Sequence, residues 1–235
     1  MMNFLRDGNL AVIDIVALIW FLLCWGGYNW YASHGANARH SLVGASHGHR
    51  LNWARQLLRR ENRVADSSLV GNLMRSVSFY ANTTIYVIAG LMALWSTLDH
   101  TIGIVSELPF ARQSARELWE LRLILLIFVF VFAYFKFTWA LREFNLLSIM
   151  IGGAPDSKVV LAAEDFCDDY AQRMAAINSL AGEEFNRGVR SYYFGLAALA
   201  WFIQPWLFLG ATTLVVIVLY RRDYNSSLLK IVRPD

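Results

Sequence analysis

Long apolar stretches alternate with polar segments along the chain, and four of these stretches are long enough to cross a lipid bilayer. A transmembrane helix needs about 20 predominantly apolar residues to span the hydrocarbon core. The four stretches cover approximately residues 12–31, 77–98, 121–147 and 192–220. The pattern predicts an all-α, polytopic membrane protein with four transmembrane helices in one membrane domain, residues 1–235.

The fourth stretch contains Pro205 near its middle. Proline removes one backbone hydrogen bond and clashes with the preceding turn, so it kinks a helix. The stretch is too short to cross the bilayer twice, and we expect one tilted, bent helix. The side-chain amide of Gln204 is expected to satisfy the carbonyl group that the proline leaves unpaired.

Two long segments between the spans predict amphipathic helices, at about residues 50–76 and 156–190. In the second segment, apolar side chains recur every three or four residues, which is the period of a half-buried helix. Asp156 and Ser157 provide a start signal for it. The first segment shows a weaker version of the pattern, and the polar, glycine-rich residues 33–50 before it predict a loop.

Composition and charge support the membrane class and suggest an orientation. Hydrophobic residues make up 57% of the chain and charged residues 17%, against about 25% charged in soluble domains. Twelve Lys and Arg residues lie in segments 31–76 and 142–190, and seven lie on the other side of the predicted spans. The positive-inside rule therefore places both long segments in the cytoplasm and both chain ends outside, as in a multi-pass protein of a bacterial inner membrane.

The two long segments carry opposite net charge. Residues 31–76 contain seven Arg and two acidic residues, whereas residues 142–190 contain five basic and eight acidic residues. One interpretation is that the two segments dock on each other. The other is that the basic segment lies on anionic lipid head groups.

Four sequence blocks are more distinctive than composition. They are WFLLCWGGYNWY (20–31), GNLMRSVSFYANTTIYVIAGLMAL (71–94), FKFTWALREFNLLSIMIGGAP (135–155) and FNRGVRSYYFGLAALAWFIQPW (185–206). These blocks resemble the signature blocks of the domain of unknown function 599 family, which are small multi-span membrane proteins of bacteria and plants. The resemblance covers nearly the whole chain in order. It implies the four-span layout and supplies no substrate, cofactor or reaction.

Lys136 is the most informative polar residue, because it lies within the third predicted span. A charged side chain inside the bilayer is costly and marks a functional site by default. The alternative is that its ammonium group extends to the nearby interface. Arg142, Glu143 and Asn145 follow within one or two turns and are candidates for a polar cluster with it. Apart from Lys136 and Asp14, at the edge of the first span, we expect no charge within the spans.

Other polar residues of the spans have structural explanations as well. Asn82, Thr83 and Thr84 are consecutive, so at least one of them faces a neighbouring helix or a water-filled cavity. Tyrosine and arginine at the end of a span are typical membrane-interface anchors. The candidate anchors are Arg75, Arg190, Tyr192 and Tyr193.

Four histidines, His34, His40, His47 and His49, precede the second span. Imidazole is a common metal ligand, but the spacing matches no closed zinc pattern, and whether these residues bind metal stays open. The chain contains no phosphate-binding loop, nucleophile elbow or HExxH helix. We therefore expect neither an enzyme nor a cofactor, and no nucleic-acid partner.

Two functional classes remain. The first is a homo-oligomeric channel or small transporter, which is favoured by Lys136, by the polar run at Asn82 and by the expected kink at Pro205. The second is a structural or adaptor subunit that binds another membrane protein complex, which is favoured by the scarcity of charge within the spans. Taken together, these observations favour a channel or transporter over an adaptor.

Overall fold

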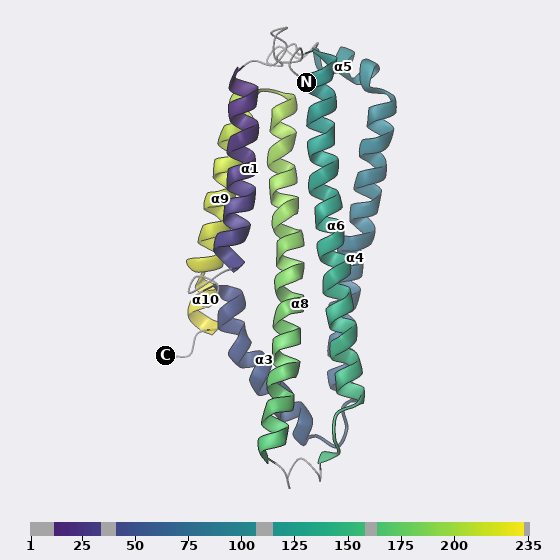
Figure 1. The fold of residues 1–235 in the computed structure, drawn as a ribbon, viewed down its shortest axis with the longest axis vertical. Helices are drawn as coiled ribbons and strands as arrows, with labels where there is room; N and C mark the ends of the chain where they lie inside the picture. The colour runs from purple at the N-terminus through teal and green to yellow at the C-terminus, as the bar shows by residue number, and fades with distance from the viewer. Residues whose placement is uncertain (1–11, 34–40, 107–114, 158–163, 233–235) are drawn as a thin grey trace.

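The structure, a computed structural model, describes residues 12–33, 41–106, 115–157 and 164–232. These residues form helices and turns and include no β-strand (Figure 1). The helices are α1 (Val12–Ser33), α3 (Leu42–Arg59), α4 (Val64–Ser96), α5 (Leu98–Ser106), α6 (Arg116–Gly152), α8 (Glu164–Leu199), the 3₁₀ turn η1 (Ala200–Phe202), α9 (Pro205–Tyr224) and α10 (Ser227–Val232).

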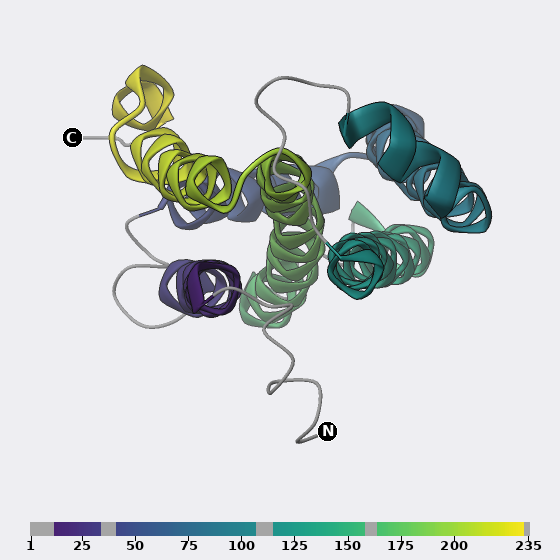
Figure 2. The ribbon, with the colours of Figure 1, turned by 90° about the horizontal axis from the view of Figure 1, so that it is seen from above.

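The molecule has two halves along its long axis (Figure 1). The upper half is the one in which α1 begins, and the lower half is the one in which α8 begins. In the upper half α8 lies in the centre, with α1 and α9 on one side and α6 and α4 on the other (Figure 2). The lower half contains α3 packed against the first part of α8, together with the adjoining ends of α4 and α6.

Four described helical stretches are long and apolar enough to cross a membrane, which confirms the predicted class. They are Val12–Ser33, Val64–Ser96, Arg116–Gly152 and Pro205–Val232. The first and third contain the corresponding predicted spans, and the second contains all but the last two residues of the span predicted at 77–98. The fourth differs from the prediction.

Residues 192–220 do not form one bent helix. Helix α8 ends at Leu199, and α9 begins at Pro205 and runs back in the opposite direction (Figure 1). Pro205 occupies the first turn of α9, where a missing N–H group leaves no hydrogen bond unmade. The proline therefore starts a new helix rather than kinking a continuous one.

Hydrogen bonds to α1 establish the directions of these helices. Near the start of α1, the indole of Trp201 donates to Asp14 at 2.9 Å, and near its end, the Tyr28 hydroxyl donates to Asp223 at 2.7 Å. Helices α1 and α9 therefore run parallel, and α8 runs antiparallel to both. The starts of α1 and α9 consequently lie at the upper end, and their last turns lie near the join with the lower half (Figure 1).

The lower segments also differ from the predicted boundaries. Helix α3 begins at Leu42, inside the expected loop, because the Ser41 hydroxyl accepts a hydrogen bond from the Gly44 amide and caps the helix. The expected helix at 50–76 is interrupted after Arg59, and α4 then continues without a break from Val64 into the second span. The described part of the helix expected at 156–190 begins at Glu164 and extends past that range to Leu199.

An apolar cluster packs the helices of each half together. The lower cluster joins α3, α4, α6 and α8, and the upper cluster joins α1, α6, α8 and α9. The upper cluster is rich in aromatic rings, and Phe21 packs against both Phe194 and Phe208, with ring centres 5.8 and 5.2 Å apart. These rings fill the space between α1, α8 and α9.

Candidate functional site

Charged side chains meet where the apolar upper half joins the lower half. The Lys136 ammonium on α6 lies 2.8 Å from Glu184 Oε2 on α8. The pair is largely enclosed, with 24% of the lysine side chain and 11% of the glutamate side chain exposed. Lys136 therefore forms an ion pair with a neighbouring helix and does not pair with Glu143.

The same carboxylates on α8 extend this pair into a network, which we call the lower ion network. Arg187 lies 2.8 Å from Glu184 and 3.4 Å from Glu183. Arg190 lies 3.3 Å from both Glu183 and Asp223, and only 4% of its side chain is exposed. The network therefore links α6, α8 and α9 through alternating charges.

Helix α1 joins the lower ion network through two hydroxyl groups. The Ser33 hydroxyl donates to Glu183 at 2.7 Å, and the Tyr28 hydroxyl donates to Asp223 at 2.7 Å. The Arg190 guanidinium also lies over the Tyr28 ring, 5.7 Å from its centre. Every charge of this network therefore has a partner on another helix or on the adjoining turn of α8, as charges at a membrane boundary require.

A second ion pair lies near the top of the apolar half. Arg122 on α6 and Asp14 on α1 are 3.5 Å apart, and 1% and 0% of their side chains are exposed. Trp201 donates to the same Asp14 oxygen, and the Arg122 guanidinium lies 5.6 Å from the centre of the Trp201 ring. Residues of α1, α6 and the turn after α8 thus meet in one buried polar contact, which we call the upper ion pair.

The expectation that the spans carry no charge beyond Lys136 and Asp14 is therefore wrong. Arg122 is at the start of the third predicted span, and its burial depends on an aspartate 108 positions earlier. The sequence does contain a signal for this pair, because Asp14 and Arg122 lie at the same predicted depth in two different spans. The network residues Glu183, Glu184 and Asp223 lie outside the predicted polar clusters, because their partners come from distant parts of the chain.

Two of the other candidates, Arg142 and Asn145, do not join Lys136 in a cluster. The carboxyl group of Glu143 interacts electrostatically with Lys136 and Glu184. Arg142 and Asn145 are exposed, and Arg142 lies over the Trp139 ring on its own helix. Glu143 is half-buried, and its Oε2 atom has no hydrogen-bond partner among the described residues. The residues of the predicted polar cluster, Arg142, Glu143 and Asn145, thus lie on two different faces of α6.

Of the three consecutive polar residues, only Thr84 is buried. Its hydroxyl lies 2.7 Å from the Tyr192 hydroxyl on α8, as expected for a contact between helices. Thr83 donates to the carbonyl of Phe79 on its own helix, and Asn82 is exposed. Gln204 precedes α9 in an extended conformation, and there is no kinked helix for its amide to repair.

The candidate interface anchors separate into two groups. Arg75 is exposed and donates to Asn72 on its own helix. Tyr193 accepts a hydrogen bond from Arg222 on α9 at 2.6 Å. Arg190 is instead buried in the lower ion network, and Tyr192 bonds to α4, so neither lies as an anchor at an exposed interface.

The two described histidines of the four, His47 and His49, do not converge. His47 contacts the Ser179 hydroxyl at 2.8 Å, and His49 contacts the carbonyl of Val232 at 2.9 Å. His34 and His40 lie outside the described residues. Among the described residues, no three His, Cys, Asp or Glu side chains gather in a way that would hold a metal ion.

The oppositely charged segments are in contact in the lower half. Arg55 on α3 donates to Asp168 on α8 at 2.7 Å, and the hydrogen bond lowers the pKa of that carboxyl group. The two helices also share the lower apolar cluster. Helix α3 is thus docked on α8 by both apolar contacts and charge.

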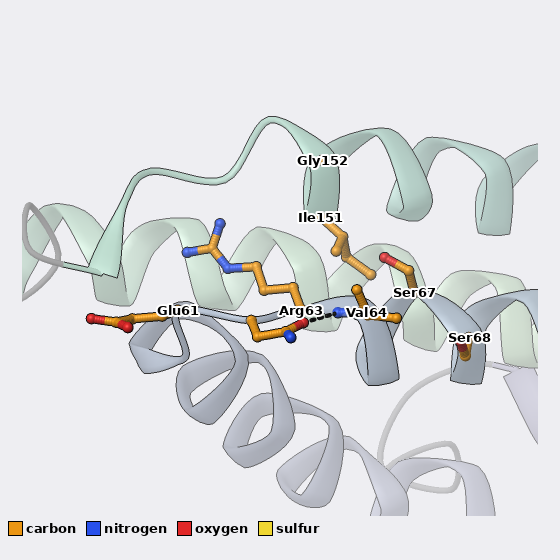
Figure 3. A pocket seen from close by; sticks show the side chains of 8 residues that line it. Glu61, Arg63, Val64, Ser67, Ser68, Ile151 and Gly152 are labelled. Atoms are coloured by element: carbon orange, nitrogen blue, oxygen red, sulfur yellow. Dashed lines mark hydrogen bonds between the residues drawn. The ribbon is translucent and has the colours of Figure 1, made fainter.

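A cavity of about 850 Å³ opens at the lower tip, between the start of α4 and the end of α6 (Figure 3). Arg63 points toward the segment after Gly152 and donates to the carbonyls of Ala154 and Pro155 at 2.9 and 2.6 Å. Glu61 points away from it (Figure 3). Because the Arg63 guanidinium already donates to backbone carbonyls, its role at this cavity is to connect the start of α4 to the segment after α6.

The comparison with protein families matches the sequence blocks quoted above. The family model described as Protein of unknown function, DUF599, matches residues 16–228. The chain belongs to this family. The match contains the lower ion network and Arg122, whereas Asp14 lies two positions before its first residue. Neither the curated proteins nor the solved structures provide a match to this DUF599 chain.

Proposed function

We propose that this protein carries an ion or a small charged solute across a membrane, as a homo-oligomeric channel or small transporter. The observation that supports this proposal is the enclosure of ion pairs at both ends of the apolar half. Asp14 and Arg122 are buried at the upper end, and Lys136 pairs with Glu184 at the lower end. Ionisable side chains within membrane spans are costly, and they commonly mark the path of an ion or a proton.

The positions of the ion pairs support a conformational change in which one helix shifts relative to the others. The upper ion pair joins α1 to α6, and the lower ion network joins α8 to α6 and α9. Aromatic rings fill the space between the two levels. In the proposed mechanism, a solute charge competes with one partner of a pair, and the helix that carries the released partner then shifts.

The path of the chain supports a specific orientation. Because α9 returns from the upper end, we propose five crossings, by α1, α4, α6, α8 and α9, with the lower half in the cytoplasm of a bacterial cell. On this path sixteen Lys and Arg residues lie on the lower side and three, Arg6, Arg112 and Arg116, on the upper side. The positive-inside rule favours this arrangement more strongly than it favours four crossings.

Helix α4 supports self-association. Phe79, Tyr86 and Met92 on α4 have 67%, 76% and 51% of their surface exposed. In the proposed assembly this apolar face contacts a second copy of the chain. The alternative function, an adaptor subunit, draws on the same face, which would then bind a different membrane protein.

The proposal is tested by reconstituting the purified protein into lipid vesicles and measuring its mass in mild detergent. We expect a homo-oligomer, and a flux of protons, cations or anions into the vesicles above that of protein-free vesicles. A monomer that transports none of these and purifies with a stoichiometric membrane protein would contradict transport and favour the adaptor.

A further inference from the structure

A polar cavity of about 300 Å³ lies between α3, α4 and α8, below the apolar half. Four polar side chains line it, Arg50, Ser76, Asn178 and Asn186, and the apolar side chains of Leu73, Phe144 and Phe185 complete its wall. None of the described residues that line it is acidic. The cavity shares no residue with the lower ion network.

The Arg50 guanidinium lies against Gly182 of α8, and a side chain at position 182 would require it to shift. A Cβ atom at position 182 would lie 2.7 Å from Arg50 Nη2. Among the described residues, Arg50 forms no hydrogen bond and no ion pair, and its Nη1 atom is out of contact with solvent. Burial lowers the pKa of the Arg50 guanidinium. An enclosed cation of this kind is costly unless an anion accompanies it.

Glu183 is a carboxylate that acts electrostatically on Arg50, and it is already engaged. It attracts the Arg50 charge, but its Oε1 atom accepts a hydrogen bond from Ser33 at 2.7 Å and lies 3.3 Å from Arg190. The carboxylate therefore belongs to the lower ion network. The positive charge of Arg50 is left for a ligand in the cavity.

Two amides stand beside this arginine. Asn178, Gly182 and Asn186 are spaced four residues apart, which places them on one face of α8. Asn178 is 6% exposed. Within the described part of the chain neither asparagine forms a hydrogen bond. Amide N–H groups that line a cavity without a partner are available to an acceptor from outside the chain.

We propose that this cavity binds the phosphate group of an anionic ligand. The planar guanidinium of Arg50 matches the oxygens of a phosphate in a bidentate fashion, and the asparagine amides supply further donors. The apolar wall of Leu73, Phe144 and Phe185 accommodates the organic part of the ligand. Basic cavities between helices on the cytoplasmic side are typical sites for lipid head groups, and a soluble phosphate compound presents the same group.

Thermal unfolding of the detergent-solubilised protein tests this site, with phosphatidylglycerol, phosphatidylcholine and inorganic phosphate as the probes. We expect phosphatidylglycerol or inorganic phosphate to raise the unfolding temperature, because a ligand that binds only the folded state stabilises it. A response to phosphatidylglycerol alone identifies a lipid head group, and a response to inorganic phosphate identifies a soluble source. Phosphatidylcholine is the comparison for a general effect of lipid.

The matched variants are Arg50→Gln and Arg75→Gln, which remove the same charge from neighbouring helices. Arg75 is exposed and lines no part of the cavity. Arg50→Gln should weaken the apparent affinity for the active probe by roughly tenfold or more, and Arg75→Gln should leave it unchanged. Gly182→Ala keeps the charge but displaces the guanidinium, and it should also weaken binding. Equal responses of wild type and Arg50→Gln, or an equal effect of phosphatidylcholine, would overturn the proposal.

Discussion

Trp201 donates a hydrogen bond to Asp14 across 187 positions of sequence, at a distance of 2.9 Å. The contact brings the turn after α8 against the first turn of α1, at the upper end of the apolar half. Because Asp223 bonds to Tyr28 near the other end of α1, the chain must reverse between Trp201 and Asp223. The buried pair of Asp14 with Arg122 forms at the same place.

Breaking the upper ion pair from one side should destabilise the protein strongly. Asp14→Leu removes the carboxylate beside the buried Arg122 guanidinium, and loss of one partner of a buried pair costs about 3–5 kcal/mol. The double variant Asp14→Leu/Arg122→Leu should recover most of that loss, because an apolar pair often replaces a buried ion pair without cost. Thermal unfolding in detergent measures both effects.

The control for this cycle is the exposed pair of Arg116 and Asp99, in which 52% and 76% of the side chains are exposed. Asp99→Leu should leave the free energy of unfolding nearly unchanged, because an exposed pair contributes little. Equal stabilities of the Asp14→Leu single and double variants would contradict the account of the upper ion pair.

The reversal at Pro205 predicts the side on which the end of the chain lies. In a background with Cys24→Ala and Cys167→Ala, a cysteine at Asn225 should be protected in intact cells from a membrane-impermeant thiol reagent. A cysteine at Asp99, at the other end of the apolar half, should react with it. Labelling of both positions from outside would favour four crossings instead.

Gly188 on α8 lies so close to α6 that an added methyl group at this position should destabilise the protein. A Cβ atom at Gly188 would lie 2.8 Å from two carbon atoms of the buried Phe137 ring. Gly188→Ala should therefore lower the free energy of unfolding by about 1–3 kcal/mol, as overpacking does. Gly90→Ala is the matched control, since nothing lies within 4 Å of its added Cβ. It should stabilise α4 by about 0.5–1 kcal/mol, and an equal loss in both variants would argue against the packing of α8 on α6.

The contact of Arg55 with Asp168 predicts a pH dependence of the lower half. The hydrogen bond from Arg55 lowers the pKa of Asp168, so its contribution to stability is present above the unfolded pKa, about 3.9. It is lost as the pH falls through the folded pKa. The protection of the α3 amides, taken relative to their intrinsic exchange rates at each pH, should therefore decrease in acid, by a small amount because both side chains are exposed.

Asp168→Asn should weaken this acid-dependent change, whereas Asp169→Asn should preserve it. Asp169 pairs with Arg173 within α8 and does not hold α3. Protection of the α3 amides that does not change with pH in the wild-type protein would contradict the role of Arg55.

Much of the fold could be predicted from the sequence, because hydropathy reports directly which residues avoid water. The spans of α1, α4 and α6 follow from their apolar length. The reversal before Pro205 could not be predicted in this way, since the turn at Ala200–Phe202 is itself apolar and shows no polar break. A proline between two apolar runs is compatible with both a kink and a new helix start.

The candidate site was predictable only in part. Lys136 is conspicuous because it interrupts an apolar run, but its partner Glu184 lies in a segment expected to be an amphipathic helix outside the membrane. Arg190 has the sequence context of an interface anchor, and its burial results from Asp223, 33 positions away. Pairings at this separation depend on the packing of α8 against α6 and α9.

Ion flux in vesicles shows whether the enclosed charges serve transport. Lys136→Met should reduce the flux of the reconstituted protein by about tenfold or more if the lysine lies on the path, the equivalent of about 1.4 kcal/mol. Arg142→Met, an exposed residue of the same helix, should leave the flux unchanged at equal amounts of folded protein. Flux of Lys136→Met equal to that of the wild-type protein would contradict a role of Lys136 in transport.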